Sequence, residues 1–336
     1  MTPSTGRRKR ALITGISGMD GSHLADFLLN KGYEVHGLIR RHAISDAVLQ
    51  NIYHIRKEIE LHAGDMTDAG SLNDVVAEVK PDEVYNLAAQ SFVGTSWRMP
   101  RQTAEVNAVG VVNILEACRK HAPEARIYQA STSEMFGKSD LIRGGCDEET
   151  PFYPRSPYGV AKLYGHWMCV NYRESYDQHI SCGILFNHES ERRGIDFVTQ
   201  KIAHGVAKIH LGLADHITLG NLDAQRDWGY APEYVEAMWL MLQQDKPDDY
   251  VIGTGEVHSV NEFLEQAFEI IGCKYPHEQN GLIRQDPRFM RPADVEYLKA
   301  NSQKARQVLG WKPSTTLRAM VIIMVQAQVK KLRETQ

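Results

Sequence analysis

Apolar runs alternate with amphipathic stretches along the first half of the chain. The runs lie at residues 10–15, 34–39, 59–63, 83–88, 126–130 and 180–186, and they have the near-continuous hydrophobicity of strands that are buried on both faces. The stretches between them are typical of amphipathic helices. The alternation predicts an α/β fold of βαβ units, with a Rossmann-type doubly wound parallel sheet covered by helices on both faces.

The pattern loosens after about residue 190. Short strands and loops rich in Gly, Asp and Pro follow, with helical patterns at residues 232–244, 261–271 and 316–332. We therefore expect a dinucleotide-binding domain over residues 1–190, to which some later segments return, and a smaller mixed α/β substrate lobe over 191–336. Open α/β sheets bind ligands outside the carboxyl ends of their strands, so the lobe is expected to pack over that edge.

The composition is that of an ordinary globular protein. The 336 residues are 43% hydrophobic and 24% charged, which is enough for a nucleotide-binding sheet and an appended lobe. The formal net charge of −4 argues against a general nucleic-acid-binding or anionic-membrane surface. Neither nucleic acid nor membrane is therefore expected as a partner, whereas small anionic molecules remain compatible with this charge.

The five cysteines are an odd number and widely spaced, with no C-x-x-C pair. This favours reduced thiols over a disulfide framework or a zinc site, and no metal is expected. Residues 7–10 are basic, but no apolar signal core follows them, and no run approaches the ~18 apolar residues of a membrane span. We therefore expect a cytoplasmic protein.

A glycine-rich turn follows the first predicted strand. Gly15, Gly18 and Gly21 precede a helical stretch, so backbone amides and the helix N-terminus can approach a pyrophosphate without an intervening Cβ. The strand before this turn and the helix after it favour a cofactor loop over a plain tight turn. Arg40 and Arg41 end the second strand about 20 residues later, where NAD enzymes carry an acidic residue. They favour NADP, with a solvated basic strand end as the alternative.

Two further strand ends are placed along such a cofactor. Asp65, in the segment 63–66, follows the third strand and can accept a hydrogen bond from the adenine amino group. Residues 87–91 follow the fourth strand, where they would line the ribose and pyrophosphate.

A Tyr-x-x-x-Lys pair follows the fifth strand. Ser156 can cap and Pro157 can open a helix on which Tyr158 and Lys162 share one face. A nearby ammonium lowers the pKa of a tyrosine toward that of a general base. Such pairs often occur by chance, and the weight of this one comes from its position one βα unit after a polar strand end.

That strand end carries Ser131, Thr132 and Glu134. Thr132 or Ser131 can hydrogen-bond a substrate oxygen that is being oxidised. Glu134 is more than an oxidation needs, and a solvated loop charge or a salt-bridge partner is its alternative role. We favour a base for a carbon acid: once a neighbouring alcohol is a ketone, the adjacent C–H is acidic, and a positioned Glu can remove it and help to expel a β-hydroxyl as water.

These residues lie in longer segments that resemble a known family. Over nearly its whole length the chain is similar to the extended short-chain dehydrogenases/reductases, and within them to the GDP-mannose 4,6-dehydratase family. The matching segments are residues 14–18 with 20–22, 85–91, 128–134, 151–158, 184–190, and 219–223 with 226–229. Related epimerases and reductases lack the Thr-x-Glu pair in this form, and dTDP-glucose dehydratases usually carry Asp-Glu there.

The resemblance implies a lyase with no net redox change. Tyr158 would deprotonate the sugar 4-hydroxyl while NADP takes the C4 hydride, with Thr132 assisting. Glu134 would then take the C5 proton, water would leave from C6, and the hydride would return to C6. The product would be a GDP-4-keto-6-deoxy sugar, and NADP would be recycled in place.

The resemblance also completes two sets of binding residues, with the C-terminal lobe holding the GDP-sugar. The expected cofactor contacts are Gly15, Ile16, Ser17, Gly18, Met19, Asp20, Arg40, Arg41, Asp65, Met66, Leu87, Ala88, Ala89, Gln90, Ser91, Gln102, Lys162, His188 and Arg193. The expected substrate contacts are Ser91, Asn187, Lys201, Arg226, Arg291 and Asp294. A surface or interdomain salt bridge is the alternative for the charged members, most evenly balanced at Lys201. The arginine-rich segment after the second strand is similar to one that reaches a neighbouring subunit in the family, which implies a homodimer or homotetramer.

The chain departs from the family pattern at Met19, His23, Gln102, Glu191 and Asp294. None of these positions removes a candidate catalytic group. Glu191 adds a negative charge beside the cofactor contacts, and Asp294 has a shorter reach toward the nucleotide than the usual Glu.

Three alternative functions are compatible with the sequence. A GDP-heptose 4,6-dehydratase would use the same residues with more room near C6. A nucleotide-sugar 4-epimerase or reductase is opposed by Glu134. A non-catalytic nucleotide-sensing protein would keep the fold, since fold does not fix function, but the joint presence of Thr132, Glu134, Tyr158 and Lys162 opposes it.

Overall fold

The computed structural model describes residues 7–40, 46–138, 144–273, 281–289, 293 and 295–335. The chain divides into two compact units. Unit 1 comprises Met1–Thr132, Pro157–Ile184 and Val235–Tyr250, and unit 2 comprises Ser133–Ser156, Leu185–Tyr234 and Val251–Gln336. Where the sequence predicts one boundary at residue 190, segments 133–156 and 185–190 lie in unit 2, and the segment that returns to unit 1 is 235–250.

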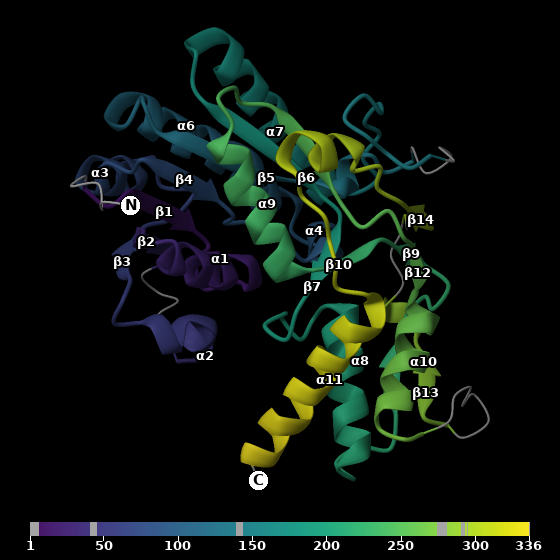
Figure 1. Ribbon diagram of the computed structural model, residues 1–336. Helices are drawn as coiled ribbons and strands as arrows, with labels where there is room; N and C mark the ends of the chain where they lie inside the picture. Colours follow the sequence, from purple (N-terminus) through teal and green to yellow (C-terminus); the bar gives the residue numbers. More distant parts are fainter. Residues whose placement is uncertain are drawn as a thin grey trace. The chain divides into compact units, whose positions relative to one another are not determined.

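Unit 1 is built on a seven-stranded parallel sheet with the order β3-β2-β1-β4-β5-β6-β11 (Figure 1). Its strands are β1 (Arg10–Thr14), β2 (Glu34–Ile39), β3 (Glu60–Ala63), β4 (Glu83–Asn86), β5 (Arg126–Thr132), β6 (Ile180–Leu185) and β11 (Asp249–Ile252). β1 pairs with β2 on one side and β4 on the other, so the order reverses there, as in a doubly wound fold. The predicted fold class and the first six strands are confirmed.

Helices cover both faces of this sheet. α3 (Ala69–Val79), α6 (Gly110–His121) and α7 (Pro157–Tyr176) bury apolar side chains on one face, in a core that includes Val76, Ile114 and Cys169. α1 and α9 pack beside each other through Phe27 and Trp239, whose ring centroids are 5.8 Å apart (Figure 1). The helices of this part of the chain are α1 (Met19–Asn30), α2 (Asp46–Leu49), η2 (Gln50–Ile55), α3 (Ala69–Val79), α4 (Val93–Ser96), α5 (Pro100–Ala104), the π-helix η3 (Glu105–Val109), α6 (Gly110–His121), α7 (Pro157–Tyr176) and α9 (Ala231–Gln243).

The described residues of unit 2 form three small sheets and a second apolar core. The sheets pair β7 with β10, β9 with β12 and β14, and β8 with β13. The core lies among α8, α10 and α11 and includes Ile202, Phe263 and Met324. The elements are η4 (Ser133–Met135), β7 (Asn187–Glu189), α8 (Val198–His210), β8 (Ile217–Leu219), β9 (Gln225–Arg226), β10 (Trp228–Tyr230), β12 (His258–Ser259), α10 (Val260–Ile270), β13 (Ile283–Gln285), η7 (Pro287–Phe289), β14 (Tyr297–Leu298), η8 (Ala305–Leu309) and α11 (Leu317–Glu334).

Among the described residues, no helix has both the length and the apolar character that a membrane crossing requires. All five cysteines are free thiols, and four of them are buried.

Candidate active site

A buried polar network joins the carboxyl ends of β1 and β4 to the middle of β5. The Thr14 hydroxyl donates to Asn86 Oδ1 (2.7 Å), and Asn86 Nδ2 donates to Gln129 Oε1 (2.7 Å). Thr14 Oγ1 also accepts hydrogen bonds from the backbone N–H groups of Leu87 and Ala88, each at 3.0 Å. The network therefore fixes the chain after β4 against the end of β1, at the reversal of strand order where doubly wound sheets bind dinucleotides.

The glycine-rich turn has the local geometry of a pyrophosphate cradle. Gly15 takes a left-handed φ of +72°, and a Cβ there would lie 3.0 Å from the backbone nitrogen of Ala88. A Cβ on Gly21 would lie 2.3 Å from the Gly15 carbonyl oxygen. No side chain caps α1, whose N-cap residue is Gly18. The residues present therefore fit a dinucleotide, because only glycine keeps this helix N-terminus close to β1 and open to a phosphate.

Most of the other predicted cofactor residues of unit 1 lie in the glycine turn or follow neighbouring strand ends. In the turn itself Ile16 and Met19 are buried, whereas Ser17 and Asp20 are partly exposed. Arg40 directly follows β2 and is exposed; Arg41 lies outside the described residues.

Asp65 and Met66 follow β3, where Asp65 Oδ1 accepts from the backbone N–H (2.9 Å) and hydroxyl (2.8 Å) of Thr67. The Asp65 carboxylate thus stabilises its own turn.

Gln102, by contrast, does not follow a strand. It is exposed on α5.

The segment after β4 is held by a residue that the sequence analysis misses. Leu87, Ala88, Ala89 and Gln90 are partly exposed, and Ser91 is exposed. The buried Asn107 side chain accepts from the Gln90 N–H (2.8 Å) and donates to the Gln90 carbonyl (2.9 Å). Asn107 lies in the π-helix η3, a local widening that often marks functional sites, and no sequence pattern announces it.

Tyr158 and Lys162 are buried on α7, which begins at Pro157 as the sequence predicts. Lys162 Nζ donates to the Ala130 carbonyl (2.9 Å) and lies 5.9 Å from the centroid of the Tyr158 ring. Burial lowers the pKa of Lys162 to about 8, although Asp20 opposes this shift. The ammonium is therefore still charged near neutral pH, and it is fixed between the end of β5 and the tyrosine.

A second residue that the sequence motifs did not identify is His166, four residues after Lys162 on α7. Its Nδ1 is 3.0 Å from Ser131 Oγ, and its Nε2 is 3.9 Å from Asp249 Oδ2. Arg173 donates two hydrogen bonds of 2.9 Å to Asp249 and thereby lowers the pKa of that carboxyl, against the effect of its burial. The signal for His166 was its spacing, four residues after Lys162 on the same helical face. Ser131 is thus engaged by His166.

Glu134 lies two residues after Thr132, in the short helix η4 at the start of a unit-2 segment, and the residue is only 8% exposed. The turn that carries it is anchored by Phe136, whose ring centroid lies 5.2 Å from that of Phe152 and 6.0 Å from that of Phe186. Because Glu134 is buried, it is not the solvated loop charge that was the alternative interpretation of this residue.

The predicted ligand residues of unit 2 begin on β7, with Asn187 and His188. His188 Nδ1 donates to the Phe186 carbonyl (2.8 Å), and its ring stacks on Tyr234 at 4.5 Å between centroids. Arg193 pairs with Glu189 at 3.0 Å. His188 is thus held in one tautomer and one orientation.

The remaining predicted substrate contacts are Lys201, Arg226, Arg291 and Asp294. Lys201 Nζ, on α8, lies 3.6 Å from the Phe289 ring centroid, and burial lowers its pKa. Arg226, on β9, is buried and donates to the Gln225 carbonyl (2.9 Å). Arg291 and Asp294 lie outside the described residues.

The chain is similar in sequence to known proteins over nearly its whole length. The family model described as GDP-mannose 4,6 dehydratase matches residues 12–324. A protein of Cricetulus griseus named GDP-mannose 4,6 dehydratase is 49% identical over 349 residues, which cover 97% of this chain and 93% of that protein. The protein of the same name from Yersinia enterocolitica is 45% identical over 356 residues, covering 97% and 95%.

Solved structures share the fold. A UDP-glucose 4-epimerase from Thermus thermophilus, in complex with NAD, superposes with a TM-score of 0.82. It is 28% identical to this chain, and the match covers 95% of this chain and 98% of the epimerase.

Proposed function

Because the chain belongs to the GDP-mannose 4,6-dehydratase family, we propose that it dehydrates GDP-mannose to GDP-4-keto-6-deoxy-mannose. The observation that carries this proposal is that Glu134, two residues beyond Thr132 in the sequence, is buried, in a chain that also has the Tyr158/Lys162 pair of an alcohol-oxidising enzyme. Oxidation alone needs only the couple. A positioned carboxylate adds the base that an elimination requires.

The proposed cofactor is NADP, a finer choice within the nicotinamide dinucleotides. The glycine turn that fits a pyrophosphate supports the dinucleotide, and Arg40 at the end of β2 supports the 2′-phosphate form. Held by these residues, the dinucleotide would supply a hydride acceptor for oxidation at sugar C4 and a hydride donor for reduction at C6. The proposed cofactor-side residues of unit 2 are His188 and Arg193.

Tyr158 and Lys162 carry the first proton transfer. Tyr158 takes the proton of the 4-hydroxyl as C4 is oxidised, and Thr132 donates a hydrogen bond to the oxygen. The Lys162 ammonium, 5.9 Å from the phenol ring centroid, favours the phenolate form. The hydrogen bond to the Ala130 carbonyl holds the Lys162 ammonium in place before the reaction begins. Its charge is therefore preorganised.

Glu134 carries the second proton transfer. The 4-ketone acidifies the C5–H bond, and Glu134 removes that proton. The protonated Glu134 then donates it to the C6 hydroxyl, which leaves as water. C5 is then reprotonated as the hydride arrives at C6, so hydrogen from solvent appears at C5. Oxidation at C4 and reduction at C6 balance, and water is the only by-product.

The nucleotide end of the substrate is assigned to charged and amide side chains, which suit a diphosphate. The proposed contacts are Ser91, Asn187, Lys201, Arg226, Arg291 and Asp294. A homodimer or homotetramer and a cytoplasmic location stay predictions.

The test is a substrate panel with the purified full-length chain and NADP. GDP-mannose, GDP-heptose, dTDP-glucose and UDP-N-acetylglucosamine are each scored for 4-keto product. We expect product from GDP-mannose at the highest kcat/KM. Preferred turnover of GDP-heptose would replace the substrate assignment, and no keto product from any member would favour the non-catalytic alternative.

The cofactor choice gives a separate prediction. Arg40→Ala should raise the KM for NADP about tenfold or more, because a charge-assisted hydrogen bond to the 2′-phosphate is lost, while the KM for NAD stays nearly the same. Arg56→Ala removes the same charge from another exposed position and is the control. Equal effects of Arg40→Ala on both cofactors would contradict the assignment.

A further inference from the structure

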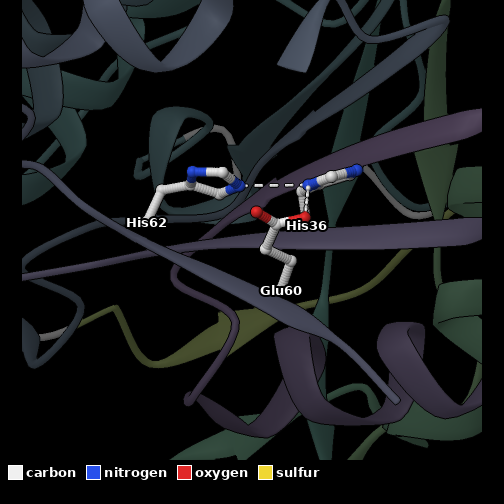
Figure 2. A group of neighbouring side chains, drawn as sticks. All are labelled: His36, Glu60 and His62. Carbon is white, nitrogen blue, oxygen red and sulfur yellow. Dashed lines mark hydrogen bonds and ion pairs between the residues drawn. The ribbon is translucent and has the colours of Figure 1, made fainter. Parts of the chain in front are cut away.

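A cluster of two histidines and a glutamate lies at the edge of the unit-1 sheet, on β2 and β3 (Figure 2). His36 Nδ1 is 3.0 Å from His62 Nε2 and 3.5 Å from Glu60 Oε2. One ligand atom from each of the three residues lies within 4.8 Å of the others. Both imidazoles are buried, whereas the Glu60 side chain is 62% exposed, so the three groups converge at a point that opens to solvent.

Each imidazole turns its other nitrogen toward a further carboxylate. His36 Nε2 is 3.1 Å from Glu34 Oε1, and His62 Nδ1 is 3.7 Å from Glu78 Oε2 at the end of α3. A carboxylate on the far nitrogen fixes the tautomer of a metal-binding histidine and raises the basicity of its ligating nitrogen. Here Glu34 favours the proton on His36 Nε2, which leaves a lone pair on Nδ1 facing His62.

From this geometry we propose a Zn²⁺ site formed by His36 Nδ1, His62 Nε2 and Glu60, with a water molecule as the fourth ligand. Tetrahedral zinc with bonds of about 2.0–2.1 Å separates its ligand atoms by about 3.4 Å, close to the two measured separations. Two neutral nitrogens and one carboxylate oxygen are ligands that zinc accepts. The solvent-exposed side of Glu60 provides the entry path.

The position of the site in the sheet indicates a structural role. Among the described strands, β3 is at the edge of the sheet and has β2 as its one neighbour, and the two strands pair in parallel with His36 opposite Glu60. His36 and Glu60 lie near the amino ends of their strands, whereas Thr132 ends β5 and Glu134 follows it. The ion therefore pins the edge strand to the sheet and takes no part in sugar chemistry.

The sequence gives no sign of this site, because its histidines are 26 residues apart and show no metal-binding spacing. A second group among the described residues, His166, Cys182 and Asp249, has ligand atoms at similar separations. Its carboxylate is already bound by Arg173 through two hydrogen bonds, and a guanidinium beside the ligands opposes a cation. That group serves as the competing location in the test.

The test titrates Zn²⁺ alone into the metal-free full-length chain without a histidine tag, against a chromophoric chelator. We expect one Zn²⁺ per chain and a rise in Tm on binding. Glu60→Gln should weaken the affinity at least ~10-fold, and His62→Gln should remove specific binding. Glu58→Gln, at a nearby exposed position, and Cys182→Ser should bind as the wild type does.

Replacement of Zn²⁺ by Co²⁺ separates the two locations. The proposed site should give visible absorption without a thiolate charge-transfer band. No binding at micromolar free Zn²⁺, or wild-type affinity in both Glu60→Gln and His62→Gln, would overturn the proposal. So would loss of binding in Cys182→Ser or a thiolate band with Co²⁺. Circular dichroism checks that each variant folds. If His62→Gln fails to fold, Glu60→Gln still decides the test, because Glu60 is exposed.

Discussion

Tyr158→Phe is expected to lower kcat for 4-keto product by about 10²–10⁴-fold, with little change in substrate affinity. The substitution removes only the phenolic oxygen and keeps the ring in its buried position on α7. Without that oxygen, the proton of the 4-hydroxyl has no acceptor, so hydride transfer from C4 cannot begin. Lys162 cannot replace it, because its ammonium is a donor that already binds the Ala130 carbonyl.

The measurement is single-turnover absorbance of the reduced nicotinamide, together with steady-state product formation. Both should be lost in Tyr158→Phe. Tyr164→Phe is the matched control, because Tyr164 lies on the same helix with its side chain exposed, and it should behave as wild type. Near-normal turnover in Tyr158→Phe would remove Tyr158 from the mechanism.

The sheet was predictable because its strands are buried on both faces and read as continuous apolar runs. The glycine turn and the helix start at Pro157 were equally predictable, because each depends on the conformational preferences of a single residue type. β11 was not, because a four-residue strand inside a region with lobe-like composition carries too little periodicity.

Some side chains could not be predicted for another reason, because their contacts are with residues of other elements. Asn107 clamps Gln90 from a π-helix, and His36 meets His62 through strand register. Neither contact leaves a spacing signal along the chain. His166 is intermediate, because its helical spacing from Lys162 was visible but its partner Ser131 comes from another element.

Glu134→Gln is expected to separate the two halves of the proposed reaction. Glutamine keeps the size of the buried side chain and its capacity for hydrogen bonds, but it is not a base. Proton removal from C5 should therefore fall by about 10²–10⁴-fold, while Tyr158 and Lys162 still support oxidation at C4. Reduced nicotinamide should form in a single turnover and persist, because elimination no longer provides the acceptor carbon at C6.

Solvent deuterium makes this contrast measurable. Wild-type product formed in D₂O should carry deuterium at C5, and Glu134→Gln should neither form product nor exchange C5 at a comparable rate. Glu149→Gln, at an exposed position in the same unit, controls for the lost charge and should retain both activities. If Glu134→Gln lost hydride transfer to the same extent as C5 exchange, the carboxylate would act before or during oxidation, and the C5 base would have to be sought elsewhere. Loss of exchange with retained hydride transfer is the result that only a dedicated second base produces.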